Sequence, residues 1–316
     1  MSDASAALQS VSVSTARSVP AGAGAVGYAV ATKGSVPRQL GMSRAGLGAN
    51  GFEGKTGQIL AMPNGDGLLV AIGIGDAGEI DANGVRSAAA GFARAASKFE
   101  HLATNLADVA DVDADDAGRA VVEGVLLGSY RYVGLKNADD TGSKLTALTV
   151  LAGSKRAKAV ERGADAGRVI AGAAAFAREL ANTPPTYLNA KDIAAKAAEL
   201  GPDADLQVEV FNKDDLAAMG CGGIIGVNRG STEPPRMVKL TYSPRNPTGH
   251  LAMVGKGIMY DSGGLSLKPS DAFHQVMKMD MSGAAAVLSA MSTLKALGCR
   301  SKVTAWLMCT DNMPSG

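Results

Sequence analysis

Strand-like and helix-like runs alternate along most of this chain, and that alternation restricts its fold more than any other feature. Apolar, β-rich runs separate runs that carry apolar residues at helical spacing. In the first half the strand-like runs are 27–32, 58–62, 68–75 and 145–153, and the helix-like runs are 82–100 and 117–130. Strands interleaved with helices of this length favour an α/β domain. We therefore predict an N-terminal α/β domain with a mixed sheet flanked by helices.

The second half continues the alternation after a helix-like run at 164–182, which ends before Pro184 because proline disfavours helix in the residue before it. The runs that follow predict helices at 190–200 and 274–297, strands at 206–211, 236–242, 250–255 and 302–309, and a glycine-rich turn at 221–226. We place the domain boundary near residue 160. The expected domains are residues 1–160 and 161–316, both of the α/β class.

The composition favours a soluble globular protein. The 316 residues are enough for two domains that each bury a core, and 46% of them are hydrophobic while 19% are charged. A formal net charge of +1 leaves no electrostatic footprint for nucleic acid, which argues against a nucleic-acid partner. No run reaches the roughly 18 apolar residues of a membrane span, and the N-terminus lacks the basic region of a signal peptide.

The cysteines point to a reducing compartment. Cys221, Cys299 and Cys309 are odd in number and form no CxxC pair. That pattern argues against a disulfide framework and against a structural zinc site. We therefore predict a cytoplasmic protein without a membrane partner.

Two glycine-rich patterns resemble nucleotide-binding motifs but fit them poorly. GxGxxG occurs at Gly22, Gly24 and Gly27 and again at Gly73, Gly75 and Gly78. Only the second follows a strand-like run, and helix signals resume only near Asp81, so its loop does not open directly into a helix. GHLAMVGKG lacks both the spacing of a P-loop and its Ser or Thr. We therefore assign no nucleotide cofactor.

Six charged residues lie in a glycine-rich and otherwise apolar segment, VGKGIMYDSGGLSLKPSDAFHQVMKMDMSGAAA at 254–286, and four of them are candidate functional residues. These four are Lys256, Asp261, Lys268 and Asp280. A buried charge without a partner costs several kcal/mol, so such residues persist when they are paired or bind a metal. The chain's three histidines lie far apart and form no HExxH pair, so a metal site must depend on carboxylates and lysine. This segment predicts a metal-dependent hydrolase.

Lys256 and Asp261 each allow a functional and a structural interpretation. Lys256 directly follows an apolar strand-like run, where active sites of α/β sheets form. Burial beside a cation would leave a neutral amine that can bind a metal, whereas the alternative is a lysine whose ammonium reaches solvent. Asp261 precedes Gly263 and Gly264, which allow a tight turn back toward the strand, and its alternative is an ordinary turn aspartate.

Asp280 interrupts an apolar run. In a continuous helix it would share one face with Met277 and Ala284, so its carboxylate would project from a stripe that faces the core. A metal ion would neutralise that charge. The structural alternative is a helix cap or an ion pair, for example with Lys278.

The sequences VGKGIMYDSGGLSLKP and MKMDMSGAAAV strongly resemble the motifs of the leucyl aminopeptidase (cytosol aminopeptidase) family of two-metal exopeptidases. Further similarity lies in ARELANTPPTYLNAKDIA at 177–194 and in the stretch that begins GCGGIIGVNRGSTEPPRMVKLTY at 220–242. Residues from about 165 to 316 resemble the family's catalytic domain. Residues 1–160 resemble its more variable N-terminal domain.

The resemblance implies a specific site and reaction. Lys256, Asp261 and Asp280 would bind two divalent ions, Mn²⁺ or Zn²⁺, with Asp261 bridging both. Lys268 would be the catalytic lysine, and Met277 would line the pocket for the first side chain of the substrate. The implied reaction is hydrolysis of N-terminal residues, leucine-like ones preferred, from peptides with a free N-terminus by a metal-activated water. The implied assembly is a cytoplasmic homohexamer.

The end of the chain departs from the family pattern. The motif NTDAEGR, which supplies an aspartate and a glutamate to the metals and an arginine to catalysis, does not occur in the sequence. We therefore expect an incomplete α/β catalytic domain, truncated at its C-terminus, that binds metal weakly and has little activity alone. The alternative is a catalytically silent fragment or a non-enzymatic binding protein that retains the first half of the fold.

Overall fold

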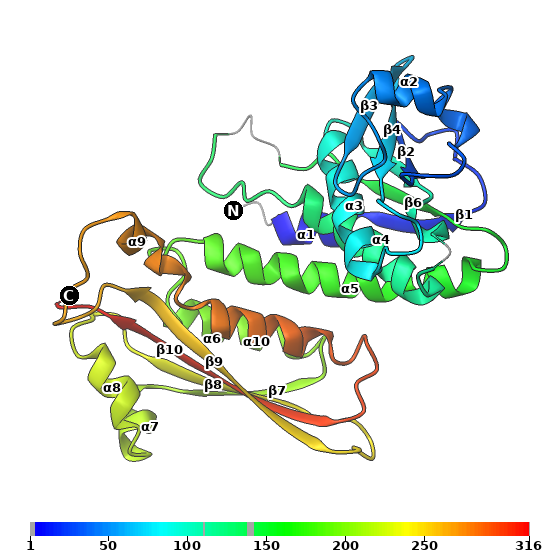
Figure 1. Cartoon of the computed structure of the whole chain (residues 1–316). Coiled ribbons are helices and arrows are strands. Elements are labelled where there is room, and N and C mark those ends of the chain that lie inside the picture. Colours follow the sequence, from blue (N-terminus) through cyan, green and yellow to red (C-terminus); the bar gives the residue numbers. More distant parts are fainter. Residues whose placement is uncertain (1–3, 110, 138–141, 316) are drawn as a thin grey trace. The chain divides into compact units, whose positions relative to one another are not determined.

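The computed structural model describes residues 4–109, 111–137 and 142–315. The chain divides into two compact units, Met1–Ala175 and Phe176–Gly316, each with its own sheet (Figure 1). Both units combine helices with strands, which confirms the predicted α/β class. The division falls within α5 (Ala157–Asn182), a helix that also contains the predicted boundary near residue 160. Across those described ranges, no helix has both the length and the apolar character needed to cross a membrane.

The first unit contains a six-stranded sheet in the order β1-β6-β5-β2-β4-β3 (Figure 1). Its strands are β1 (Ser12–Ala16), β2 (Ala25–Val30), β3 (Ile59–Asn64), β4 (Gly67–Gly73), β5 (His101–Thr104) and β6 (Ala147–Leu151). Neighbouring strands pair in parallel except β3 and β4, which are antiparallel because Gly65, at φ 58°, and Asp66 close a two-residue hairpin. The sheet is mixed, as predicted.

Helices cover both faces of this sheet. They are α1 (Ala4–Gln9), α2 (Arg44–Ala49), α3 (Ala82–Ala95), α4 (Ala114–Ser129) and the first part of α5, with short 3₁₀ turns η1 (Arg38–Leu40) and η2 (Leu106–Asp108). Val70 and Ile72 lie in a core that contains residues of α3 and α4, whereas Ala71 lies in a second core with Leu47 of α2. Alternate residues of one strand therefore serve opposite faces.

The second unit contains a four-stranded sheet in the order β7-β8-β10-β9 (Figure 1). Its strands are β7 (Leu206–Phe211), β8 (Arg236–Tyr242), β9 (His250–Asp261) and β10 (Lys302–Asn312). Only β9 and β10 are parallel to each other. Their carboxyl ends, Asp261 and Asn312, therefore lie at the same edge of the sheet, where functional sites of α/β proteins commonly form.

Two helices, α6 (Ala190–Leu200) and α10 (Ser282–Thr293), pack on one face of this sheet (Figure 1). The N-cap of α6 is Asn189, which forms a capping box with Asp192. Ile193 of α6 and Leu288 of α10 are fully buried in the same core as Leu240 of β8. The remaining helical segments are α7 (Lys213–Ala218), α8 (Gly222–Asn228), α9 (Ala272–Gln275) and η3 (Val276–Met279).

The prediction of one continuous helix over 274–297 is wrong. The segment forms α9, the 3₁₀ turn η3 and then α10, and Asp280 lies between the last two. The Asp280 amide donates to the Met277 carbonyl at 3.2 Å, which is the i to i−3 bonding of a tightened turn. Asp280 therefore does not belong to a core-facing helical stripe. The predicted turn at 221–226 is also wrong, because most of it lies in α8.

The buried cysteine gives a simple test of the second core. Cys309 is fully buried, and burial raises the pKa of its thiol to about 12. Cys221 and Cys299 are partly exposed. Since the thiolate is the reactive form, we expect a thiol reagent at neutral pH to modify Cys309 at least roughly 10-fold more slowly than the other two. The measurement is the time course of colour release from the thiol reagent. The variant Cys309→Ala should lack the slow phase. A single fast phase from all three thiols would contradict this packing.

Candidate metal centre

A β-bulge determines which side chains of β9 point the same way. Lys256 lies opposite Met308 and Ile258 lies opposite Thr310, but Asp261 lies opposite Asn312. Three residues of β9 thus match two residues of β10, so β9 contains one extra residue between Ile258 and Asp261. Without the bulge, an odd spacing of five would place Lys256 and Asp261 on opposite faces. With it, both lie on the same face of the sheet.

The Asp261 carboxylate is held by three donors. The Lys268 ammonium donates to Oδ2 at 2.5 Å. The Asn312 side-chain amide and the Gly263 backbone amide donate to Oδ1 at 2.7 and 3.0 Å. The loop that carries Lys268 is turned back by Gly263, at φ 92°, and Gly264, at φ 64°. Asp261 is therefore fixed in orientation and paired with the lysine predicted to be catalytic.

Opposing effects act on the pKa of Asp261. Burial alone would raise the pKa, but hydrogen bonds from Lys268, Gly263 and Asn312, together with the lysine charge, lower it below its ordinary value. The group is therefore ionised throughout the neutral range. An ionised carboxylate is the form that binds a metal cation.

Lys256 pairs with Asp280. The Lys256 ammonium lies 2.7 Å from Asp280 Oδ2, yet this oxygen is buried and accepts no aligned hydrogen bond. The contact is an ion pair by distance only. Asp280 Oδ2 is thus an anionic oxygen that retains its acceptor capacity and faces a cationic group.

Glycines bring α10 directly against β9. A Cβ placed on Gly255 would lie 2.6 Å from the Ala284 Cα, and one placed on Gly283 would lie 2.9 Å from the Lys256 backbone nitrogen. Both distances are too short for real side chains. The close approach explains why these positions carry glycine, and it holds Asp280, two residues before α10, within reach of Lys256.

Adding one methyl group at this contact tests its role. We expect Gly255→Ala to lower the free energy of unfolding by about 1–3 kcal/mol, because backbone atoms must shift to admit the Cβ. Urea unfolding of the purified chain measures this loss. The matched control is Gly226→Ala in α8, where nothing lies within 4 Å and a helical alanine is favoured by up to about 1 kcal/mol. Equal stability of the two variants would contradict the proposed packing.

The structure modifies two sequence expectations about these charges. Lys256 is not buried, since 60% of its side chain is exposed, whereas Asp261, Lys268 and Asp280 are 16%, 26% and 23% exposed. The ion pair considered between Asp280 and Lys278 is replaced by one with Lys256, and the Lys278 ammonium donates to the Asn182 carbonyl at 2.5 Å. The four charges therefore form two ion pairs, Lys256 with Asp280 and Lys268 with Asp261.

The residues present fit a divalent cation. Their donor atoms are one amine nitrogen and carboxylate oxygens, which suit Zn²⁺ and Mn²⁺. Each carboxylate already has a cationic nitrogen within 2.5 to 2.7 Å, and Asp280 Oδ2 accepts no hydrogen bond. In the part of the chain that the structure describes, no cluster of three His, Cys, Asp or Glu side chains is arranged to hold a metal. A set of three donors drawn from the four charges described above would include a lysine amine.

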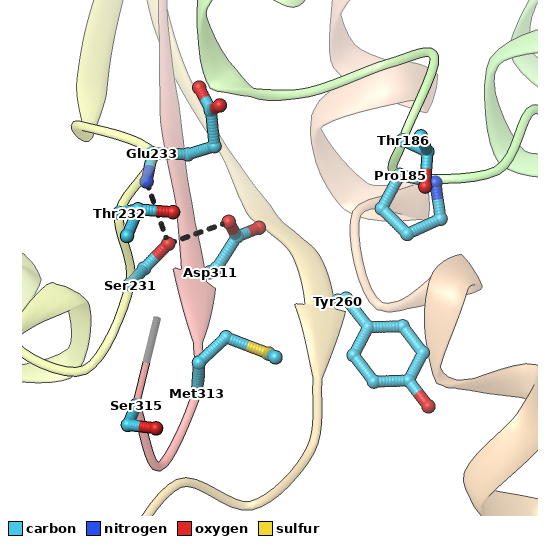
Figure 2. A pocket seen from close by; sticks show the side chains of 9 residues that line it. All are labelled: Pro185, Thr186, Ser231, Thr232, Glu233, Tyr260, Asp311, Met313 and Ser315. Carbon is cyan, nitrogen blue, oxygen red and sulfur yellow. Dashed lines mark hydrogen bonds between the residues drawn. The ribbon is translucent and has the colours of Figure 1, made fainter.

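A pocket of about 250 Å³ lies in the second unit (Figure 2). Two of its residues are sequence neighbours of residues in the candidate metal centre, but the pocket is a separate cavity. Its walls include Tyr260, which precedes Asp261, and Asp311, which precedes Asn312. The Ser231 hydroxyl donates to the Asp311 carboxylate at 2.9 Å. Burial nevertheless raises the pKa of Asp311, and the nearby Glu233 charge adds to the rise. None of the four paired charges lines this pocket, and Met277 does not line it either, so the substrate-pocket role of Met277 stays a prediction.

Sequence reasoning missed Asn312. The available signal was its position, because TDN follows the apolar run at 302–309 and polar residues at the carboxyl end of a strand are candidates for a site. What the sequence did not reveal was the bulge that turns Asp261 toward Asn312.

Two domain models of one protein family match this chain. The model of the catalytic domain of the cytosol aminopeptidase family matches residues 175–316, and the model of its N-terminal domain matches residues 41–139. The chain belongs to the cytosol aminopeptidase family. This membership confirms the resemblance found in the motifs around Lys256 and Asp280.

Individual relatives support the assignment. A probable cytosol aminopeptidase of Streptomyces avermitilis is 40% identical over 284 residues, which cover 85% of this chain and 54% of the relative. One from Leifsonia xyli subsp. xyli is 38% identical over 277 residues, covering 86% of this chain and 54% of the relative. The chain thus spans about half the length of these curated cytosol aminopeptidases.

Solved structures agree in fold. The bottromycin maturation enzyme BotP superposes with a TM-score of 0.78 at 37% identity, covering 93% of this chain and 61% of that one. The same enzyme in complex with Mn superposes equally well at 36% identity. A mutant of tomato leucine aminopeptidase reaches a TM-score of 0.82 at 22% identity, covering 96% of this chain and 63% of that one, and supports the fold alone.

Proposed function

We propose that the protein carrying this chain is a metal-dependent aminopeptidase that removes N-terminal residues, with leucine-like residues preferred, from peptides. The observation that carries the proposal is the pairing of Lys256 with Asp280 and of Lys268 with Asp261 around β9, in a chain of the cytosol aminopeptidase family. An amine and two carboxylates would provide a ligand set, and a second lysine would remain available for charge stabilisation.

Lys256, Asp261 and Asp280 would hold two divalent ions, with Asp261 bridging them. Such ions would polarise the scissile carbonyl and lower the pKa of an attacking water. To bind a metal, the Lys256 amine must lose its proton and leave its ion pair with Asp280. The Mn complex of the relative BotP supports Mn²⁺ as one suitable ion, and Zn²⁺ suits the same donors.

Lys268 would supply positive charge to the reacting group. Its ammonium is held by Asp261 and is only partly exposed, so its orientation is restricted before substrate binds. A cation fixed beside a scissile carbonyl stabilises the negative charge that develops on the carbonyl oxygen. Met277 would line the pocket for the first side chain of the peptide.

The remaining proposals concern the whole protein. We propose that it acts in the cytoplasm as a homohexamer and that its substrates are peptides with a free N-terminus. The three candidate ligands on residues 1–316 do not complete the coordination shells of two metal ions. We therefore expect this segment alone to bind metal weakly and to hydrolyse little peptide.

The test is metal-dependent release of p-nitroaniline from leucine p-nitroanilide. The protein to assay is the natural gene product that carries residues 1–316, identified by its intact mass. We expect little release after treatment with EDTA and recovery when Mn²⁺ or Zn²⁺ is added back. A natural product that binds these ions but releases no N-terminal residue from any aminoacyl substrate would contradict the proposed activity.

A further inference from the structure

Asn312 holds Asp261 from the neighbouring strand, and three features of the structure fix its side chain. The first is the bulge in β9. A regular parallel register would place Asn312 opposite Tyr260, but the extra residue places it opposite Asp261. As a result the side-chain amide of Asn312 lies 2.7 Å from Asp261 Oδ1.

The second feature is the anchoring of the Asn312 backbone. Its carbonyl oxygen accepts hydrogen bonds from the Ser262 backbone amide at 3.1 Å and from the Ser262 hydroxyl at 2.7 Å. Both lone pairs of that carbonyl are thereby used. Since Ser262 directly follows Asp261, the carboxylate and its amide donor belong to one closed set of hydrogen bonds.

The third feature is the space left by Gly264. A Cβ at that position would lie 2.4 Å from the Asn312 side-chain oxygen, so glycine there leaves room for the amide. Chemistry sets the direction of the amide, because an ionised carboxylate accepts hydrogen bonds and donates none. The NH₂ end of Asn312 therefore faces Asp261.

From these contacts we infer that Asn312 is a positioning residue of the metal centre: it orients the Asp261 carboxylate for metal binding without touching the metal. This inference rests on the proposed function. The amides of Asn312 and Gly263 donate to Oδ1 and Lys268 donates to Oδ2, so Asn312 holds the carboxylate by the oxygen that does not contact the lysine. Partners that orient metal ligands typically contribute about 10- to 100-fold to metal affinity.

Calorimetric titration of the natural gene product with MnCl₂ measures this contribution. We expect Asn312→Ala and the milder Asn312→Ser to weaken Mn²⁺ binding by about 10- to 100-fold. The control is Asn50→Ala, which removes an asparagine side chain that donates to the Gly46 carbonyl in the other unit, and we expect wild-type affinity. Unchanged affinity in a folded Asn312 variant would overturn the inference, even if that variant were less stable.

A double-mutant cycle in EDTA provides a readout that needs no metal. The urea concentration at the midpoint of unfolding is compared for the wild type, Asn312→Ala, Asp261→Ala and the double variant. If the amide acts through Asp261, the Asn312 substitution lowers the midpoint less in the Asp261→Ala background than in the wild type. Additive midpoints would overturn the inference. A natural gene product that binds no Mn²⁺ would refute the proposed function, and the cycle would still decide whether Asn312 holds Asp261.

Discussion

Replacing Asp261 by asparagine is expected to abolish divalent metal binding and, with it, metal-dependent peptidase activity. The substitution keeps the shape of the side chain but removes the charge that would be shared by two ions. The loss in Mn²⁺ affinity should exceed the roughly 100-fold upper range for partners that only orient a ligand. Calorimetric titration with MnCl₂ measures it directly.

The matched control for this experiment is Asp271→Asn. Asp271 lies in the same segment and has the same charge, but its carboxylate accepts from the His274 amide and caps α9. Asparagine caps helices about as well as aspartate, so we expect wild-type metal affinity. If Asp261→Asn bound Mn²⁺ as tightly as Asp271→Asn, Asp261 would not be a metal ligand.

Replacing Lys268 by methionine is expected to lower kcat by about 10²–10³ with a much smaller change in KM, in line with the loss of one charge-stabilising group at a developing oxyanion. Methionine keeps the length of the aliphatic chain and removes the ammonium. Steady-state kinetics on the natural gene product measure the effect. Mn²⁺ affinity should remain within a few-fold of wild type, because Lys268 would contact the ligand Asp261 and not the metal.

The control for this prediction is Lys295→Met. Lys295 donates to the Asp203 carbonyl at 3.3 Å in the same unit and is exposed. We expect its kcat to match that of the wild type. A Lys268→Met enzyme with normal kcat would rule out a catalytic role for this lysine and would leave it as the resting partner of Asp261.

The fold class could be predicted because hydrophobic periodicity is a local signal. The runs around Val70, Leu148 and Leu240 are apolar because their strands are buried, and each formed a strand. The strand β1 (Ser12–Ala16) was missed. Its sequence SVSTA is polar, and its pairing partner β6 is more than 100 residues away in the chain. Pairing over such a distance has no local signature.

The pattern of charges identified the candidate residues but not their arrangement. The motif around Lys256 and Asp280 predicted a common centre, and the structure pairs those two residues. The break between η3 and α10 was not predicted, and next to it Gly283 packs against the backbone of β9, a contact between segments that are not adjacent in sequence. The role of Asn312 depends in the same way on a bulge, which is a property of two strands together. Both the helix break and the role of Asn312 therefore depend on tertiary contacts, which hydrophobic periodicity does not reveal.

The central claim is that the Lys256 amine and the carboxylates of Asp261 and Asp280 share paired divalent cations. The most direct measurement is a crystal structure of the natural gene product grown with MnCl₂, with anomalous differences recorded for manganese. We predict two anomalous peaks about 3.5–4 Å apart. The manganese ions at these peaks should lie roughly 2.0–2.3 Å from their ligands among Lys256 Nζ and the carboxylates of Asp261 and Asp280. Manganese bound elsewhere, with Lys256 still paired to Asp280, would contradict the claim.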